Sequence, residues 1–243
     1  EPRILFHHPI LDGRVGIKAD DNSAIMTDAD IDRLIDDFVT ASKMAHDLGY
    51  DFVDLKACHG YLGHEFLGAH TRPGKYGGSL ENRTRFLRDM VGRVRAEAPG
   101  LGIGVRISIF DSLPYEDDPA TRVGNKKGIG QPSEYKGPWP YPYGFCVTEG
   151  NPLEPDLTEA FAMMEMLRKL DVRFINVTGG SPYYCPHVQR PAYYPPSDGY
   201  QPPEDPLIGV ARQIHATRRL KERFPDMLFV GTGYTYLQDY LPH

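Results

Sequence analysis

Helix-like and strand-like patterns alternate four times along this 243-residue chain, and this alternation limits its fold more than any other feature. The predicted helices span residues 28–48, 80–98, 157–170 and 207–224. Each is followed by a short, mainly apolar segment that predicts a buried strand, at residues 51–58, 102–108, 172–177 and 227–230. Such alternation is typical of parallel strands joined by right-handed helical crossovers, either in a barrel or in an open doubly wound sheet.

The first predicted helix has the clearest boundaries. Apolar and small residues recur on one face at helical spacing from Ile31 to Ala45. Thr27 and Asp30 resemble a capping box, which satisfies free backbone N–H groups, and Gly49 supplies the permissive residue that often follows a last turn. We therefore expect this helix to begin after Thr27 and to end before Gly49.

Polar residues and glycines follow the carboxyl end of every predicted strand. They are Lys56 and His59, then Arg106 and Ser108, then residues 178–180, then residues 231–233. In both parallel architectures the active site lies at this edge of the sheet. The alternation therefore predicts a binding or catalytic site there.

The spacing of the units suggests an incomplete barrel. Four strands occupy roughly 180 residues, so an eight-stranded barrel at this spacing would need well over the typical ~250 residues. The chain also opens without methionine and stops at His243, shortly into the next expected helix. We interpret residues 1–243 as one incomplete domain that lacks the first strands and the last strand. Such a sheet would have two unpaired edges and an apolar barrel interior facing water.

The composition excludes several classes of protein. With 40% hydrophobic and 25% charged residues, the chain is expected to be globular. A net charge of -6 without a basic stripe argues against nucleic-acid partners and favours small molecules. No apolar run approaches the roughly 20 residues of a membrane helix, and no signal peptide is recognisable. We therefore expect a cytoplasmic protein without a membrane partner. A homo-oligomer is possible. Cys58, Cys146 and Cys185 are too dispersed for a disulfide framework or a metal site.

Two long segments, residues 110–155 and 181–206, hold most of the 22 prolines and many of the 15 tyrosines. Both are far longer than the usual connection of about 4 to 6 residues, and such loops tend to be lids or binding loops. Their aromatic residues either cover a substrate or form an exposed interaction surface. They include Trp139, Tyr141, Tyr143, Tyr183, Tyr184, Tyr193 and Tyr194.

Residues 53–62 and 72–87 carry the most specific signal in the chain. The first segment contains His59-Gly60-Tyr61 at a strand end, and the second contains a Tyr-Gly-Gly-Ser-x-Glu-Asn-Arg-x-Arg-Phe run at residues 76–86. Together they closely resemble the signature of the old yellow enzyme family of NAD(P)H:flavin oxidoreductases. The resemblance continues in residues 104–108 and 230–234, whereas the two long loops match only in position.

The resemblance implies an α/β fold that is part of a TIM (β/α)8 barrel, with about four central β/α units and long βα loops. It also implies an FMN across the carboxyl face of the barrel, reduced by NADH or NADPH, and hydride transfer to an activated C=C bond. The flavin supplies the hydride chemistry, so the protein must polarise the substrate, donate a proton and orient the flavin.

The resemblance carries three catalytic assignments. Tyr61 aligns with the proton-donating tyrosine of the family, and the alternative is a tyrosine that only forms a wall of the site. His59 aligns with the His or Asn that binds the substrate oxygen, and the alternative is a structural histidine at the strand end. Lys56 stands where the well-known ene-reductases usually have histidine, which favours a carboxylate-bearing substrate or oxidative chemistry. Alternatively, Lys56 only pairs with Asp54 or with another neighbouring carboxylate.

The resemblance also implies a set of cofactor-binding residues. Arg106 aligns with an arginine near the flavin N1 and O2 atoms, and the alternative is a buried ion pair. Gly231, Thr232, Gly233 and Tyr234 match a strand end that offers backbone N–H groups to the FMN phosphate. The run at residues 76–86, by contrast, is interpreted mainly as structural, with turn glycines, a helix cap and ion pairs.

Three functions remain open on the sequence alone. The first is an FMN-dependent NAD(P)H oxidoreductase with Tyr61 as proton donor. The second is an oxidative, demethylating or dienoyl-CoA reductase-like member, with an iron-sulfur cluster outside this segment. The third is an inactive fragment. No His-x-His or His-Glu-x-x-His spacing favours a metal hydrolase.

Overall fold

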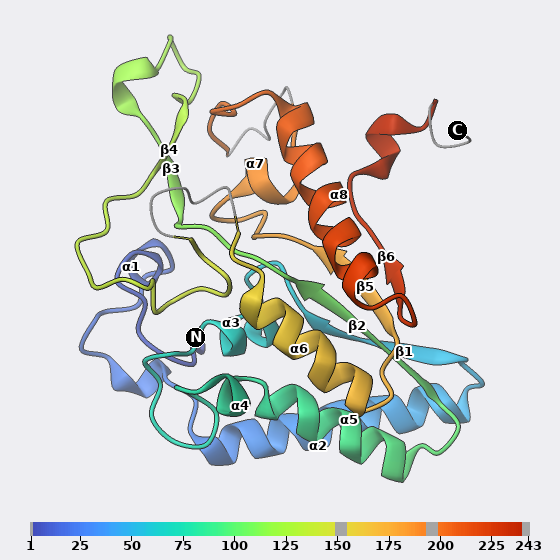
Figure 1. Cartoon of the computed structure of the whole chain (residues 1–243). Coiled ribbons are helices and arrows are strands. Elements are labelled where there is room, and N and C mark those ends of the chain that lie inside the picture. Colours follow the sequence, from blue (N-terminus) through green and yellow to red (C-terminus); the bar gives the residue numbers. More distant parts are fainter. Residues whose placement is uncertain (1, 149–154, 193–198, 240–243) are drawn as a thin grey trace.

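A four-stranded parallel sheet forms the centre of the computed structural model, which describes residues 2–148, 155–192 and 199–239 (Figure 1). The strands, in their order across the sheet, are β1 (Phe52–Ala57), β2 (Gly102–Ser108), β5 (Phe174–Thr178) and β6 (Leu228–Val230). The long helices are α2 (Asp28–Asp47), α5 (Arg85–Glu97), α6 (Thr158–Lys169) and α8 (Pro206–Arg223). These elements confirm the four predicted helix-strand units.

Each strand of this sheet pairs in parallel with the next strand of the sheet along the chain. Right-handed crossovers that always advance in one direction leave their helices on the same face of the sheet. Figure 1 shows α6 and α8 in front of the strands, with α2 and α5 below. This consecutive order is that of a barrel segment, because a doubly wound sheet reverses its order at a switch point. The prediction of an α/β fold covering part of a barrel is confirmed.

Helix α2 begins and ends as its sequence predicts. The Thr27 hydroxyl accepts a hydrogen bond from the backbone N–H of Asp30 (3.1 Å), and the Asp30 carboxylate accepts one from the backbone N–H of Thr27 (2.8 Å). At the other end Gly49 has a φ of 82°, a left-handed conformation that glycine adopts without strain. The buried face of this helix packs against α5.

The second predicted helix is broken into two. Residues 80–98 form α4 (Leu80–Arg83) and α5, with Thr84 between them. The Leu80 backbone oxygen accepts hydrogen bonds from both the Thr84 N–H (3.0 Å) and the Thr84 hydroxyl (2.8 Å), and such back-bonding often bends a helix. The prediction of one continuous helix is therefore wrong at this residue.

Several short elements lie before, between and after the predicted units, and sequence periodicity did not predict them. They are α1 (Leu11–Arg14), η1 (Asn22–Ala24), α3 (Leu62–Leu67), β3 (Tyr115–Asp117), η2 (Pro119–Thr121), β4 (Gly130–Pro132), α7 (Pro186–Gln189) and η3 (Tyr234–Leu237). Strands β3 and β4 form an antiparallel hairpin inside the first long loop. Helix α3 directly follows β1, and it therefore fixes the chain just after the expected site.

The two faces of the parallel sheet differ in burial. Side chains such as Leu55, Val105 and Ile175 are buried in the core on the helix face. On the opposite face Phe52 and Leu228 are exposed. Alternation along each strand puts Lys56 and Arg106 on this open face too.

The run at residues 76–86 contributes to packing. Tyr76 and Arg83 are among the most deeply buried large side chains of the described residues. The Arg83 guanidinium donates to the backbone oxygen of Gly78 (3.0 Å) and to the Glu159 carboxylate (3.1 Å). These contacts agree with the structural interpretation of this run.

Two further findings concern the chain as a whole. Cys58, Cys146 and Cys185 are buried and free. None of the helices in the described ranges is long and apolar enough to cross a membrane.

Candidate functional site

The chain leaves β1 through a sharp left-handed turn. His59 and Gly60 both have positive φ angles, 64° and 72°. A side chain at Gly60 would put its Cβ 2.7 Å from the Ser181 hydroxyl and 2.7 Å from the Tyr184 ring, so only glycine fits. Tyr61 then occupies the N-cap position of α3. This turn brings Tyr61 back over the end of its own strand.

Lys56 and Tyr61 form a compact cluster with Tyr183 from the loop after β5. The Lys56 ammonium lies 3.5 Å from the centre of the Tyr61 ring, which is a cation–π contact. The hydroxyls of Tyr61 and Tyr183 are hydrogen-bonded to each other, and this bond is the main cause that raises the pKa of Tyr183. Tyr61 keeps 47% of its surface exposed, so a ligand can reach its ring and hydroxyl.

The His59 backbone is fixed by two serines. Its N–H donates to the Ser108 hydroxyl (3.1 Å), and its carbonyl accepts from the Ser181 hydroxyl (3.0 Å). Burial, followed by the charge of Lys56, lowers the pKa of His59 to about 4, so the ring is neutral at pH 7. The side-chain amide of Gln189 lies 3.2 Å from Nε2. Since that amide nitrogen can only donate, Nε2 accepts and the ring proton lies on Nδ1.

Arg106 forms an ion pair on the open face of the sheet. Its guanidinium lies 2.9 Å from the Asp54 carboxylate, on the neighbouring strand. The pair is only partly buried, because 43% of the Arg106 side chain and 26% of the Asp54 side chain are exposed. Asp54 is therefore the ion-pair partner of Arg106. The alternative prediction, an ion pair between Lys56 and Asp54, is wrong.

Residues 231–234 follow β6, at the other side of the sheet. The Thr232 hydroxyl donates to the backbone oxygen of Val177 (2.7 Å), and Gly233 has a φ of 96°. A Cβ at Gly231 would lie 2.4 Å from the Tyr234 ring. Strands β2 and β5 separate this turn from β1, so the turn shares the carboxyl edge with Lys56 and Tyr61 but is not in the same cluster.

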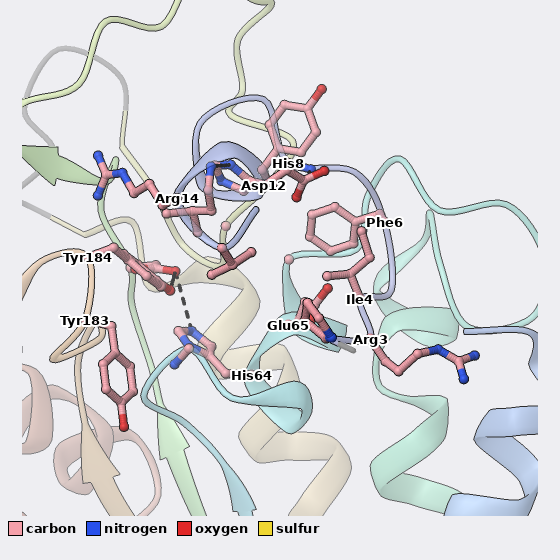
Figure 2. Close-up of a pocket in the computed structure, with 18 residues that line it drawn as sticks. Arg3, Ile4, Phe6, His8, Asp12, Arg14, His64, Glu65, Tyr183 and Tyr184 are labelled. Carbon is pink, nitrogen blue, oxygen red and sulfur yellow. Dashed lines mark hydrogen bonds and ion pairs between the residues drawn. The ribbon is translucent and has the colours of Figure 1, made fainter. Parts of the chain in front are cut away.

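A cavity of about 390 Å³ opens next to this cluster (Figure 2). Figure 2 shows His64 and Tyr184 on one side of it and Ile4 and Phe6 on the other. Tyr183 also lines the cavity, so it separates the cavity from Tyr61.

Three titratable residues beside this cavity were missed by sequence reasoning; His64 and Asp111 are buried, and Glu65 is partly buried. Burial raises the pKa of Glu65 and the pKa of Asp111, each to about 7. Burial lowers the pKa of His64 to about 4. The His64 Nε2 and the Asp111 carboxyl group are 3.6 Å apart, and burial disfavours the charged form of each. His64 and Glu65 lie in α3, the helix that follows the end of β1, and their place just after Tyr61 is a signal that could have singled them out.

The aromatic residues of the two long loops divide between core and surface. Tyr141 is buried, and its hydroxyl hydrogen-bonds to His8 Nε2 (2.8 Å). Tyr183 is exposed and belongs to the cluster around Tyr61. Tyr193 and Tyr194 lie outside the described residues.

Comparison with known proteins gives consistent matches. A model of the NADH:flavin oxidoreductase / NADH oxidase family matches residues 12–127, which include Lys56, His59, Tyr61 and Arg106. The chain is 41% identical over 94 residues to 12-oxophytodienoate reductase 1 of Oryza sativa subsp. japonica, covering 37% of this chain and 25% of that protein. It is 38% identical over 95 residues to NADPH dehydrogenase of Bacillus subtilis (strain 168), covering 38% of this chain and 28% of that protein.

Solved structures give similar matches. The old yellow enzyme homologue from Zymomonas mobilis has a TM-score of 0.43 at 25% identity, over 65% of this chain and 35% of that chain. Morphinone reductase in complex with tetrahydroNAD has a TM-score of 0.42 at 22% identity, over 63% of this chain and 33% of that chain. The chain thus spans about a third of the length of these two proteins, and about a quarter of the length of the two sequence relatives.

Proposed function

Because residues 12–127 match a model of the NADH:flavin oxidoreductase / NADH oxidase family, we propose that the protein containing this chain is an FMN-dependent oxidoreductase of the old yellow enzyme type. It takes reducing equivalents from NADH or NADPH and passes hydride to an activated C=C bond. The observation that carries the proposal is the exposed Tyr61, held between the Lys56 ammonium and the Tyr183 hydroxyl at the carboxyl edge of the sheet. That edge is where parallel α/β folds bind their ligands.

The residues along this edge fit an FMN. Lys56 and Arg106 are paired in register on the open face. Asp54 balances the charge of Arg106, so the Lys56 ammonium is the positive charge of this pair that suits an anionic reduced flavin. Gly233 has no side chain and a left-handed backbone, so the chain can closely approach a phosphate there. The Thr232 hydroxyl is already bound to Val177, so phosphate binding falls to the backbone of residues 231–233. When bound, FMN supplies the hydride.

The chain's own residues then handle the substrate and the proton. The Tyr61 hydroxyl donates a proton to the substrate carbon opposite the hydride, and the Lys56 ammonium above the ring stabilises the phenolate that remains. The proton on His59 Nδ1 is available to the substrate's electronegative oxygen, because Gln189 occupies the other ring nitrogen. Each of these roles follows the family alignment and is supported by the observed contacts.

Lys56 also favours a second candidate function. Its ammonium is not bound to Asp54 and remains at the site, where it suits a substrate that carries a carboxylate. We therefore keep oxidative, demethylating or dienoyl-CoA reductase-like chemistry, with an iron-sulfur cluster outside residues 1–243, as the alternative to simple alkene reduction. Iron-sulfur absorbance of the full-length protein, and clustered cysteines beyond His243, would distinguish this function from simple alkene reduction.

Spectroscopy and kinetics of the full-length protein test the proposal. We expect an FMN spectrum, NAD(P)H oxidation, and a loss of alkene reduction of about 10²- to 10⁴-fold in Tyr61→Phe, with flavin reduction unchanged. Tyr50→Phe is the matched control, since Tyr50 is an exposed tyrosine that precedes β1 at the opposite edge. A protein that holds no flavin and oxidises no nicotinamide would refute the proposal.

The inactive-fragment alternative is tested on the 243-residue chain itself. The open face of its sheet exposes Phe52 and Leu228, which is the observation in favour of this alternative. Titration of FMN into the chain, followed by flavin fluorescence, separates the two cases. Micromolar binding with turnover would reject the fragment interpretation, and the absence of binding would support it.

A further inference from the structure

A second cavity, of about 270 Å³, lies between the loop after β5, which contributes Arg190, and the β3–β4 hairpin, which contributes Lys127. Arg14 and Tyr183 line both this cavity and the larger one, and Figure 2 shows them on the same side of the larger one. The Tyr183 hydroxyl is bonded to Tyr61, so the second cavity adjoins the proposed catalytic cluster. The proposed flavin chemistry gives this cavity no role.

The second cavity has more positive than negative side chains in its wall. The charged residues that line it are Arg14, Lys127, Arg190, Glu116 and Asp117. The Asp117 carboxylate accepts from the Arg122 guanidinium (3.1 Å) and lies 3.7 Å from the Lys127 ammonium. The Glu116 carboxylate lies 3.9 Å from the Arg14 guanidinium. Both carboxylates are therefore balanced by neighbouring cations.

Arg190 is the cation of this wall that these pairs leave over. Its guanidinium has no ion pair and no hydrogen bond within residues 2–148, 155–192 and 199–239, and its side chain is exposed. Its backbone is held in place, because its N–H donates to the Pro186 carbonyl (2.9 Å). A guanidinium is a rigid fork of N–H donors that matches the two oxygens of a carboxylate. Arg190 thus offers an accessible positive charge to a ligand in the cavity.

Arg190 also lies near the proposed catalytic cluster. The residue before it, Gln189, contacts the His59 ring through its side-chain amide (3.2 Å). Hydrogen bonding raises the pKa of Tyr183, whereas the positive charges of Lys56 and Arg190 oppose this rise. Both cations are therefore close enough to the Tyr183 hydroxyl to act on its charge.

The rest of the lining suits an apolar group. Pro182, Pro186 and the rings of Tyr115 and Tyr200 belong to it. The Tyr200 hydroxyl is already hydrogen-bonded to His187 Nδ1 (2.6 Å). A cavity of about 150 Å³ holds a benzene ring, so 270 Å³ has room for a ring or short chain that ends in a carboxylate.

We propose that this cavity binds the anionic end of a monocarboxylate substrate, held by the Arg190 guanidinium, while the C=C bond of the substrate reaches Tyr61 past Tyr183. The carboxylate is thus assigned to Arg190, and the Lys56 ammonium stays above the Tyr61 ring. This inference rests on the proposed function for the place of the C=C bond. The carboxylate site itself does not require flavin.

A matched pair of probe compounds tests the carboxylate site on the 243-residue chain. 3-Phenylpropionate carries a carboxylate, and 3-phenylpropanamide has the same shape without the charge. Titrations followed by ¹⁵N–¹H NMR at low salt give both dissociation constants and locate the affected residues. We expect the acid to bind roughly fivefold tighter, which is about 1 kcal/mol and the upper value for a partly exposed ion pair. The difference should shrink as salt is added.

Two variants assign this preference to Arg190. Arg190→Gln should bind the acid and the amide equally, because the charge is gone, and an exposed side chain can be replaced with little effect on folding. Arg223→Gln is the matched control and should keep the wild-type preference. Arg223 is also exposed, does not line the cavity, and lies over the Phe161 ring, 5.1 Å from its centre.

Kinetics of the full-length protein test the link to the substrate. 6-Oxohept-4-enoate is an enone with a remote carboxylate, and its carboxamide is the neutral partner. Arg190→Gln should raise KM roughly fivefold for the acid and leave KM for the amide and both kcat values unchanged. A wild type that reduces neither compound would refute the proposed function and the place of the C=C bond, while the carboxylate site would stand or fall on the binding comparison.

Three results would overturn the proposal. One is equal affinity of the wild-type chain for 3-phenylpropionate and its amide. Another is an Arg190→Gln variant that still prefers the acid. The third is a variant that loses the binding preference but keeps the wild-type KM for 6-oxohept-4-enoate, which would separate this cavity from the substrate site.

Discussion

Replacing Gly60 with alanine probes the turn that positions Tyr61. An L-residue at the observed φ of 72° costs about 1 kcal/mol from backbone conformation. The new Cβ would also lie 2.7 Å from both the Ser181 hydroxyl and the Tyr184 ring. The ring cannot move freely, because its hydroxyl is bonded to the buried Asp111, so overpacking adds about 1–3 kcal/mol. We expect Gly60→Ala to lose about 2–4 kcal/mol of unfolding free energy.

Gly49→Ala separates the two contributions. Gly49 has a similar φ of 82°, but a Cβ there would meet nothing within 4 Å. It should lose only the backbone contribution of about 1 kcal/mol. Urea unfolding of both variants, with unchanged m-values, measures the difference. If both variants lose the same free energy within about 0.5 kcal/mol, the close packing of the β5 loop on Gly60 does not constrain the turn.

Two more predictions concern titratable groups near the site. Burial raises the pKa of Glu65 from 4.5 to about 7, so the folded protein holds this proton over a pH range in which the unfolded chain has lost it. Wild-type stability should therefore fall relative to Glu65→Gln by up to about 3 kcal/mol as pH rises through this range, and urea unfolding that shows a pH-independent difference would contradict this. Tyr61→Phe should lower the pKa of Tyr183, because the hydrogen bond between the two hydroxyls is the main cause that raises it. ¹³C NMR of ring-labelled tyrosine measures this pKa, with Tyr50→Phe as control, and an unchanged titration of Tyr183 would rule out the shared hydrogen bond.

Local signals in the sequence predicted most of the fold. The caps of α2 were recognisable because they depend on residues within one turn, such as Thr27 and Asp30. The buried strands were recognisable from short apolar runs followed by glycine or polar residues. The break at Thr84 was not, because whether a threonine hydroxyl bonds to its own helix depends on local geometry that a residue pattern does not specify.

The candidate site was predictable only in part. Lys56, His59 and Tyr61 are adjacent in sequence, so a turn after β1 was enough to bring them together. The pairing of Arg106 with Asp54 requires the register of β1 with β2, which sequence patterns did not provide. Tyr183 and Gln189 contact this cluster through long-range packing, and only the structure reveals that. The catalytic and flavin-binding roles themselves stay predictions.

The loop after β5 has a consequence for how such a site can diversify. Within residues 181–189, Ser181 binds the His59 carbonyl, Tyr183 binds Tyr61, and Gln189 binds the His59 ring. One short segment therefore sets the tautomer of the His59 ring and the orientation of the Tyr61 hydroxyl, which both follow a different strand. Substitutions confined to this segment can retune the chemistry while the core that holds β1 is left unchanged.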